Sequence, residues 1–441
     1  MDYFISNQTE FDQYRCHTFA PGDRICFAKG GVFRGQFAPK GQGVAERPIV
    51  VTAYDPLTKQ ILQDPSEGRP VIHGMGQVDA VVKLFNQSFW HIENLEMTNT
   101  NGSQGEQGDI YGIHVIGEDV GLLQHIHIRN CAIHHVNGCV GDKWRGGIHL
   151  DVYGDQRKTW FDDVLIEQNV IQDVGGVGIS NTSTWKAIFT EDWTPWTRLV
   201  VRNNWVERTG RNGIILRVAE DPLIEYNTFA YNSRADVGHS VLTFDTRRAV
   251  MQFNEAYGNT GDPEDADRGG FDADFKCEDT IIQYNYSHEN HWFCGIMRKY
   301  NKRVVIRYNV SVNEVMGCYL YGFPSEDGLD VVKVHDNLHY FKEGIKAQIF
   351  PSPRLERTPI KTDFRNNVFF FAEPGAWGPE PDADCVFAGN YYYNVAPRGT
   401  NAVTDVSAVV GQMAHITSQV LQAGVRTKPI MPDPDRPIIV S

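Results

Sequence analysis

The stretch Val304-Val305-Ile306-Arg307-Tyr308-Asn309 decides the fold, because an apolar run ending in Asn recurs along most of the chain. Further copies are Val164–Asn169, Leu199–Asn204, Leu223–Asn227, Val250–Asn254, Ile281–Asn285, Val331–Asn337, Asp363–Asn367 and Cys385–Asn390. Successive asparagines are 35 residues apart from 169 to 204 and 23 apart from 204 to 227. Apolar runs at such a period, with turn residues between them, predict stacked β-coils.

A second strand follows each Asn, and most of its copies open with Gly. Examples begin at Gly112, Gly147, Gly178, Gly213, Gly270, Gly295, Gly317 and Gly344. Asn tolerates left-handed backbone, and its side-chain amide can bond to the equivalent residue of the next coil. We therefore expect an asparagine ladder through the stack.

This repeat closely resembles the pectate-lyase-like superfamily, over roughly Gly22 to Asn394. The resemblance implies an all-β, single-stranded right-handed parallel β-helix. That superfamily contains lyases, hydrolases, epimerases and phage tailspikes, so the fold does not decide the reaction. We expect one domain over 1–441, with an N-terminal cap (1–20), coils (21–394) and a C-terminal cap and tail (395–441). Short capping helices are expected at Asn7–Tyr14 and Asp405–Gln422.

The composition restricts the partners and the compartment. The chain of 441 residues carries 41 Lys and Arg against 55 Asp and Glu, a net charge of -14, which disfavours nucleic acid and anionic membranes as partners. No stretch reaches the ~18 apolar residues of a membrane span, and no signal-peptide pattern opens the sequence. The expected location is cytoplasmic, or secreted with the signal peptide absent. The eight cysteines show no metal-site spacing, and we expect reduced, structural thiols.

The segment Gly269–Lys276 contains the candidate catalytic residues. Asp272 and Asp274 alternate with apolar Phe271, Ala273 and Phe275, so both carboxylates should lie on the same face of a strand. If equivalent residues stack, Arg217, Asp245, Asp274 and Lys299 occupy four consecutive coils. In the same alignment, Asp272 stacks with Thr243, Met297 and Tyr319 of the neighbouring coils, and Tyr321 stacks with Lys299. A slip of one residue would turn these side chains inward.

Carboxylates this close cannot all ionise normally, which favours an acid/base pair. The predicted catalytic residues are Asp245, Asp272 and Asp274. The predicted substrate-binding residues are Arg217, Lys299, Tyr319, Tyr321, His239, His291 and Trp185. Two alternatives remain: a solvated face of ion pairs, or a Ca²⁺ site formed by Asp245, Asp272 and Asp274 with help from the acidic segment 262–267.

Paired carboxylates and Trp-rich insertions favour a glycoside hydrolase acting on an oligo- or polysaccharide without a cofactor. A polysaccharide lyase with a Lys or Arg base and Ca²⁺ is the main alternative, and a non-catalytic glycan-binding solenoid is the second. The chain also looks similar to glycoside hydrolase family 141, which would imply α-L-fucosidase or xylanase activity. The sugar, the linkage and the oligomeric state stay open.

Overall fold

The computed structural model describes residues 1–63, 68–102, 108–141, 143–186, 190–261, 267–296, 300–321, 332–350, 362–378 and 385–424. They form two compact units. Unit 1 comprises Met1–Leu223 with Asn232–Asp236, and unit 2 comprises Ile224–Tyr231 with Val237–Ser441. No helix in the described part of the chain is long and apolar enough to cross a membrane.

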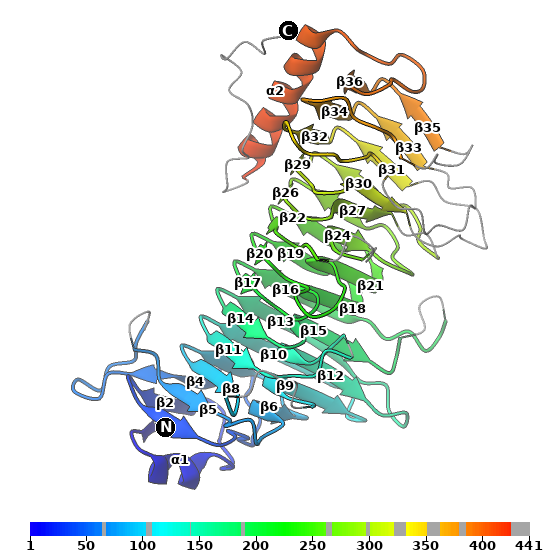
Figure 1. Ribbon diagram of the computed structural model, residues 1–441. Coiled ribbons are helices and arrows are strands. Elements are labelled where there is room, and N and C mark those ends of the chain that lie inside the picture. The colour runs from blue at the N-terminus through cyan, green and yellow to red at the C-terminus, as the bar shows by residue number, and fades with distance from the viewer. Residues whose placement is uncertain are drawn as a thin grey trace. The chain divides into compact units, whose positions relative to one another are not determined.

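Unit 1 contains one helix and two parallel sheets (Figure 1). Its larger sheet consists of β1 (Asp2–Ile5), β2 (Arg24–Ala28), β4 (Ile49–Tyr54), β6 (Ala80–Phe85), β7 (Trp90–Glu93), β9 (Tyr111–Glu118), β10 (Leu122–Arg129), β12 (Gly146–Tyr153), β13 (Trp160–Glu167), β15 (Val177–Ser183), β16 (Trp196–Arg202) and β18 (Ile214–Glu220). Its smaller sheet consists of β3 (Val32–Arg34), β5 (Val71–His73), β8 (Glu96–Asn99), β11 (Ala132–Val136), β14 (Val170–Val174) and β17 (Trp205–Glu207).

Unit 2 repeats this organisation. Its larger sheet consists of β19 (Leu223–Glu225, which begins at the last residue of unit 1), β21 (Val241–Arg247), β22 (Val250–Gln252), β24 (Gly269–Ala273), β25 (Ile281–Gln283), β27 (Trp292–Ile296), β28 (Val305–Arg307), β30 (Gly317–Tyr321), β31 (Val332–His335), β33 (Thr362–Arg365) and β35 (Cys385–Ala388). Its smaller sheet consists of β20 (Thr228–Ala230), β23 (Glu255–Tyr257), β26 (Tyr286–His288), β29 (Val310–Val312), β32 (Leu338–Phe341), β34 (Val368–Phe371) and β36 (Tyr391–Tyr393).

Strands three apart in sequence pair in parallel, which is the signature of a coil with three strands. In unit 1, β9 pairs with β12, β10 with β13 and β11 with β14. In unit 2, β24 pairs with β27, β25 with β28 and β26 with β29. The sequence predicted two of these strands, the one that ends at Asn and the one opened by Gly. The short third strand that follows each Asn was not predicted.

The asparagine ladder is confirmed in both units. The backbone N–H and side-chain amide of Asn285 both donate to Asn309 Oδ1, each at 3.0 Å. The same double contact joins Asn169 to Asn204 in unit 1 and, in unit 2, Asn227 to Asn254, Asn254 to Asn285, Asn309 to Asn337, Asn337 to Asn367 and Asn367 to Asn390. These buried amides satisfy backbone groups at every turn.

The left-handed residue of the turn is not the ladder Asn but the residue before it. Tyr284 and Tyr308 have φ values of 54° and 52°. Their rings stack on each other at 5.5 Å, coil on coil. The prediction that Asn itself takes the left-handed conformation was therefore wrong for these coils, because the left-handed position lies one residue before the ladder Asn.

Both expected helices are present. Helix α1 (Gln8–Tyr14) begins at Asn7, whose side chain accepts the backbone N–H of Glu10. Its buried Phe11 packs on Phe27, Phe33 and Phe37 in the core of the first coils. Helix α1 therefore covers core residues of unit 1, as expected of a cap.

Helix α2 (Val406–Ala423) begins at Asp405 and ends at Gly424, which is left-handed with φ 116°. Its buried residues Val409, Met413, Ile416 and Val420 pack against residues of β26, β29, β32 and β34. Because these strands belong to successive coils, α2 lies along the stack and covers the outer side of the smaller sheet, rather than lying across an open end (Figure 1).

The cysteines behave as expected of structural thiols. None of the eight forms a disulfide, and five of them are buried. Burial raises the pKa of the Cys26, Cys131 and Cys277 thiols to about 12. These thiols are therefore protonated and unreactive at neutral pH.

Candidate active site

The acidic strand β24 lies between β21 and β27 in unit 2. Asp272 pairs in register with Leu242 on β21 and with Gly295 on β27, and Gly295 pairs with Leu320 on β30. The prediction that Thr243, Asp272, Met297 and Tyr319 occupy equivalent positions of successive coils was therefore wrong. That alignment treated Gly270, Gly295 and Gly317 as the first residues of equivalent strands, whereas β27 begins at Trp292 and contains Gly295 in its interior.

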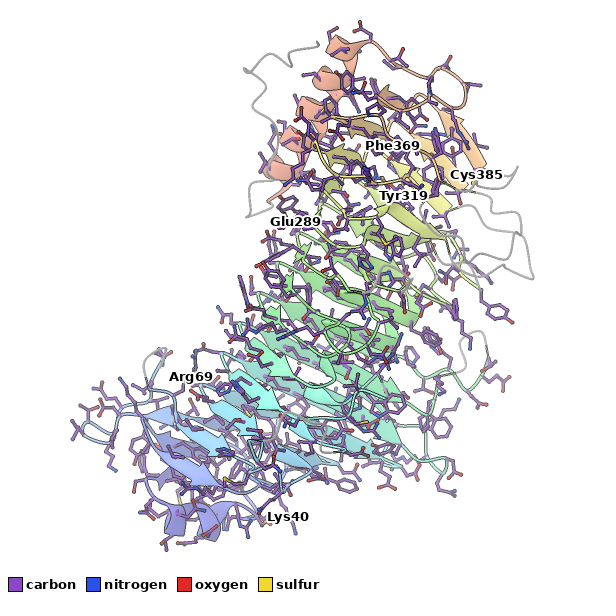
Figure 2. All side chains as sticks on the ribbon, viewed as in Figure 1. Lys40, Arg69, Glu289, Tyr319, Phe369 and Cys385 are labelled. Carbon is purple, nitrogen blue, oxygen red and sulfur yellow. The ribbon has the colours of Figure 1, made fainter. Side chains whose placement is uncertain are left out.

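Tyr319 shows the consequence of this wrong alignment. It pairs with Cys294, is fully buried, and its hydroxyl lies 2.8 Å from His339 Nε2 (Figure 2). Burial lowers the pKa of His339 to about 3, so this ring is neutral. The expectation that Tyr319 faces the substrate was wrong in its geometry, because the residue belongs to the aromatic core. Lys299 and the side chain of Tyr321 lie outside the described residues.

The three predicted carboxylates occupy different surroundings. Asp272 and Asp245 are buried, and Asp274 is half-buried. Asp245 is left-handed with φ 55°, and its backbone N–H donates to Phe275 O at 3.0 Å. The backbone N–H of Asp274 donates to Thr243 O at 3.0 Å. The close group of ligand atoms that contains Asp272 includes neither Asp245 nor Asp274.

Asp272 instead meets His239 and Asp267. His239 Nδ1 lies 3.0 Å from Asp267 Oδ1 and 3.6 Å from Asp272 Oδ2. Ligand atoms of the three side chains all lie within 4.8 Å of one another. His239 and Asp272 are almost fully buried, with side-chain exposures of 0% and 1%, whereas Asp267 is 34% exposed. The buried Asp272 and the partly exposed Asp267 thus form a pair of carboxylates, and the imidazole of His239 lies beside both of them.

Two glycines make this arrangement possible. A Cβ at Gly295 would lie 2.6 Å from Asp272 Oδ1, and a Cβ at Gly269 would lie 2.5 Å from His239 Cδ2. Any side chain at these positions would meet the carboxylate or the imidazole ring. The glycines therefore matter here for the space that they leave rather than for their backbone freedom.

His291 lies beside the same segment. It is buried, and its Nε2 accepts the backbone N–H of Gly261 at 3.1 Å. Asn259 donates through its side chain to Gly238 O and Gly269 O, both at 2.9 Å. These bonds fix the backbone directly before His239 and at the start of β24. His291 therefore holds the segment in place and does not join the close group of His239, Asp267 and Asp272.

Arg217 and Trp185, the other predicted substrate contacts, belong to unit 1. The Arg217 guanidinium donates to Asn181 O at 3.1 Å and to Lys143 O at 3.0 Å. Trp185 is half-buried, and its backbone N–H donates to Ser183 Oγ at 3.1 Å. Arg217 therefore holds two backbone segments of unit 1 together, whereas the bond of Trp185 is local.

Unit 1 also contains a fully buried polar group formed by His114, His149 and Asp151. His149 lies 2.7 Å from Ser180 Oγ and 3.1 Å from Asp151 Oδ2. Burial lowers the pKa of His149, and hydrogen bonds from both histidines hold the pKa of Asp151 well below its usual range, against the effect of burial. His149 pairs in register with His114 on β9 and with Ser180 on β15. The group is enclosed, which suits a structural role.

Asp267 is the residue whose role was not predicted. The sequence placed it in the acidic segment 262–267, as possible help for a cation, and not opposite Asp272. Its signal was its position two residues before the Gly-Gly pair that opens β24. A carboxylate there can turn back over the strand face, but only the register shows which residue it meets.

Comparisons with known proteins agree with the fold. No protein-family model matches the chain. The chain is 24% identical to a lacto-N-biosidase of Bifidobacterium longum subsp. longum over 92% of its own length, and it spans only 30% of the length of that relative.

Two solved structures illustrate the structural similarity. The lacto-N-biosidase of glycoside hydrolase family 136 from Eubacterium ramulus matches with a TM-score of 0.64 and 19% identity, over 92% of this chain and 68% of that one. A mannuronic-acid-specific lyase of polysaccharide lyase family 6 from the human gut microbiota matches with a TM-score of 0.56 and 14% identity, over 97% and 96%. The chain thus has the right-handed parallel β-helix of such carbohydrate-active proteins, and these relatives are not described as family 141 enzymes.

Proposed function

We propose that the chain is a glycoside hydrolase that uses Asp267 and Asp272 as its paired carboxylates. The observation that carries this proposal is the approach of the two side chains to within 4.8 Å around His239. Carboxylate oxygens that lie within this limit suit the ~5–5.5 Å spacing of retaining glycosidases better than the ~6.5–9.5 Å spacing of inverting ones. A retaining mechanism is therefore proposed.

The surroundings of the two carboxylates suggest their roles. Asp272 is held in a fixed position over Gly295, and we assign it the attack on the anomeric carbon that forms a glycosyl ester. Asp267 is partly exposed, so it can protonate the leaving oxygen and then take a proton from the water that cleaves the ester. His239 contacts both and positions them. Two carboxylates in different environments are the general requirement for such a division.

The sequence similarity supports an oligosaccharide that carries a lacto-N-biose unit as the first substrate to test, because both lacto-N-biosidases cover 92% of this chain. The net charge of -14 also suits a neutral glycan better than a uronate polymer. No cofactor takes part in the proposed reaction.

A lyase acting with a bound cation is the second candidate. His239, Asp267 and Asp272, whose ligand atoms lie within 4.8 Å of one another, could hold a cation. Arg268, which follows Asp267 directly in the chain and is 7% exposed, is the Arg available as the base. The similarity to the family 6 lyase covers 97% of this chain and 96% of that one. The two candidates differ in their products, since a hydrolase adds water and a lyase leaves a double bond.

The test is product analysis by mass spectrometry on lacto-N-biose-containing oligosaccharides and on uronate polymers, with and without a chelator. The expected products carry one added water, are insensitive to the chelator, and retain the anomeric configuration by NMR. Asp267→Asn and Asp272→Asn should each lose about 10²-fold or more in kcat, whereas the exposed control Asp12→Asn should keep full activity. Unsaturated products that disappear with the chelator would favour the lyase, and equal turnover by all variants would contradict the proposed residues.

A further inference from the structure

Three histidines and one aspartate form a cluster on the larger sheet of unit 1, whereas the residues proposed for catalysis belong to unit 2. The cluster consists of His91 on β7, His125 and His127 on β10, and Asp163 on β13. His91 and His127 pair in register and stack with ring centroids 4.9 Å apart and planes 3° apart. His125 and His127 are partly exposed, whereas Ile126 and Ile128 between and after them are buried.

The ring nitrogens of these histidines converge. His91 Nε2 lies 2.9 Å from His125 Nε2, and ligand atoms of all three histidines lie within 4.8 Å of one another. Two nitrogens bound to one Zn²⁺ at ~2.0–2.1 Å with tetrahedral angles would be roughly 3.3 Å apart. The His91 and His125 nitrogens are therefore already close to the spacing of two ligands of one ion.

Asp163 supplies the outer partner that such sites use. Its Oδ2 lies 2.6 Å from His125 Nδ1, and its Oδ1 lies 3.4 Å from His127 Nε2. A carboxylate that accepts the Nδ1–H of His125 leaves the lone pair on Nε2, the nitrogen that faces His91. Metal-binding histidines are commonly oriented by a carboxylate in this way.

The access to the cluster also suits a metal ion. The side chains of His125, His127 and Asp163 are 21%, 14% and 30% exposed, which leaves a path for an ion from solvent. The neighbouring Arg129 is paired with Glu93 at 2.8 Å.

We propose that His91, His125 and His127 bind one transition-metal ion of the Zn²⁺ class, with Asp163 orienting His125. Three imidazole ligands favour such an ion over Ca²⁺ or Mg²⁺, which prefer oxygen. The ligands come from β7 and β10, and the orienting carboxylate from β13, so the ion would tie together three consecutive coils. The His127 ligand atom lies within 4.8 Å of those of His91 and His125.

The test uses the full chain, stripped with a chelator, dialysed and titrated with Co²⁺ while its visible absorption is recorded, followed by displacement with Zn²⁺. One Co²⁺ per chain with intense visible bands is expected for the wild type and for His415→Ala, which changes an exposed histidine of α2. His91→Ala and His125→Ala should weaken binding at least tenfold, and Asp163→Asn about 10- to 100-fold.

Thermal melting checks that the variants fold and gives a second readout. Zn²⁺ should raise the Tm of the wild type and of His415→Ala, and not that of His91→Ala. Binding that is unchanged in His91→Ala and His125→Ala would overturn the site, and so would binding that is lost in Asp267→Asn instead. Absence of saturable binding below about 1 mM metal would also overturn it. Glycan cleavage is a separate readout, since the proposed catalytic carboxylates lie in unit 2.

Discussion

At the scale of single residues, the position of the Asp272 carboxylate depends on the missing side chain at residue 295. Asp272 Oδ1 occupies space that a Cβ on Gly295 would enter, at 2.6 Å. Real Cβ atoms do not approach oxygen so closely, so a side chain there must displace the carboxylate. A shift of about 1 Å in a reacting group can cost 10²-fold in rate.

Gly295→Ala should therefore lower kcat by roughly 10²-fold and change KM little, because the reacting carboxylate moves while the protein still folds. The measurement is steady-state kinetics beside thermal melting. The matched control is Gly411→Ala in α2, where a Cβ meets nothing within 4 Å. That variant should keep full activity and gain about 0.5–1 kcal/mol of stability from helix propensity. Unchanged kcat in Gly295→Ala would contradict the role of Asp272.

A second residue of interest is Glu314, which is buried behind the segment that carries His291. Its carboxyl accepts the hydroxyls of Ser287 and Ser311 and the backbone N–H of Asn290. Burial raises the pKa of Glu314 from 4.5 to about 8, although these donors oppose the shift. Asn290 in turn accepts the backbone N–H of Asn259, so Glu314 supports the backbone next to β24.

The raised pKa of Glu314 predicts a pH dependence of stability. Between pH 4.5 and about 8 the folded protein holds a proton that the unfolded chain has released, so the free energy of unfolding falls as pH rises through this window. Above about pH 8 this group causes no further loss. Glu314→Gln should flatten the decline in Tm, and the exposed control Glu373→Gln should leave it unchanged. Parallel Tm profiles for wild type and Glu314→Gln would contradict this assignment.

At the scale of elements, the sequence predicted the coils and the ladder because both depend on local patterns. Alternating apolar residues predict the strand, and the recurrent Asn predicts the turn at its end. The register between strands depends instead on where each strand begins. Gly295 lies inside β27 and Gly270 lies near the start of β24, so aligning the two glycines displaced the predicted stack by more than one residue.

Residues of the candidate site could be predicted only where they depend on local sequence and not on strand register. Asp272, His239 and His291 were selected from local pattern and position, and the structure brings Asp272 and His239 together. Tyr319 was misplaced because its strand was misaligned. The partnership with Asp267 depends on how a loop returns over β24, which no local pattern encodes.

The ladder makes a quantitative prediction for its own elements. Asn309 is buried, donates to Ile282 O and Asn337 Oδ1 at 2.9 Å, and accepts two bonds from Asn285. Asn309→Ala removes these bonds and leaves buried backbone groups unsatisfied, so it should cost about 3 kcal/mol or more. Chemical denaturation measures this loss, with the exposed Gln13→Ala as control. A loss below about 1 kcal/mol would mean that the strands alone hold the coil.

At the scale of the whole molecule, the net charge of -14 separates the two candidate substrates. A neutral glycan feels little of this charge, so kcat/KM should change less than about twofold between roughly 50 and 500 mM salt. A uronate polymer is repelled at low salt, and its cleavage should become faster as salt screens the repulsion. Initial rates across a salt series distinguish these cases. A steep rise with salt on the preferred substrate would contradict a neutral glycan.

The asparagine ladder also bears on how the protein ages. Deamidation converts Asn to Asp, which replaces a donor NH₂ group with an acceptor oxygen. At Asn337, for example, the new oxygen would face Ile306 O and Asn367 Oδ1, which now accept from its amide at 2.9 and 3.0 Å. Asn is among the thermolabile residues, but these amides are buried and their backbone is held at every turn. Chemical damage should therefore accumulate first at exposed asparagines such as Asn366, and a lesion within the ladder would follow local opening of a coil.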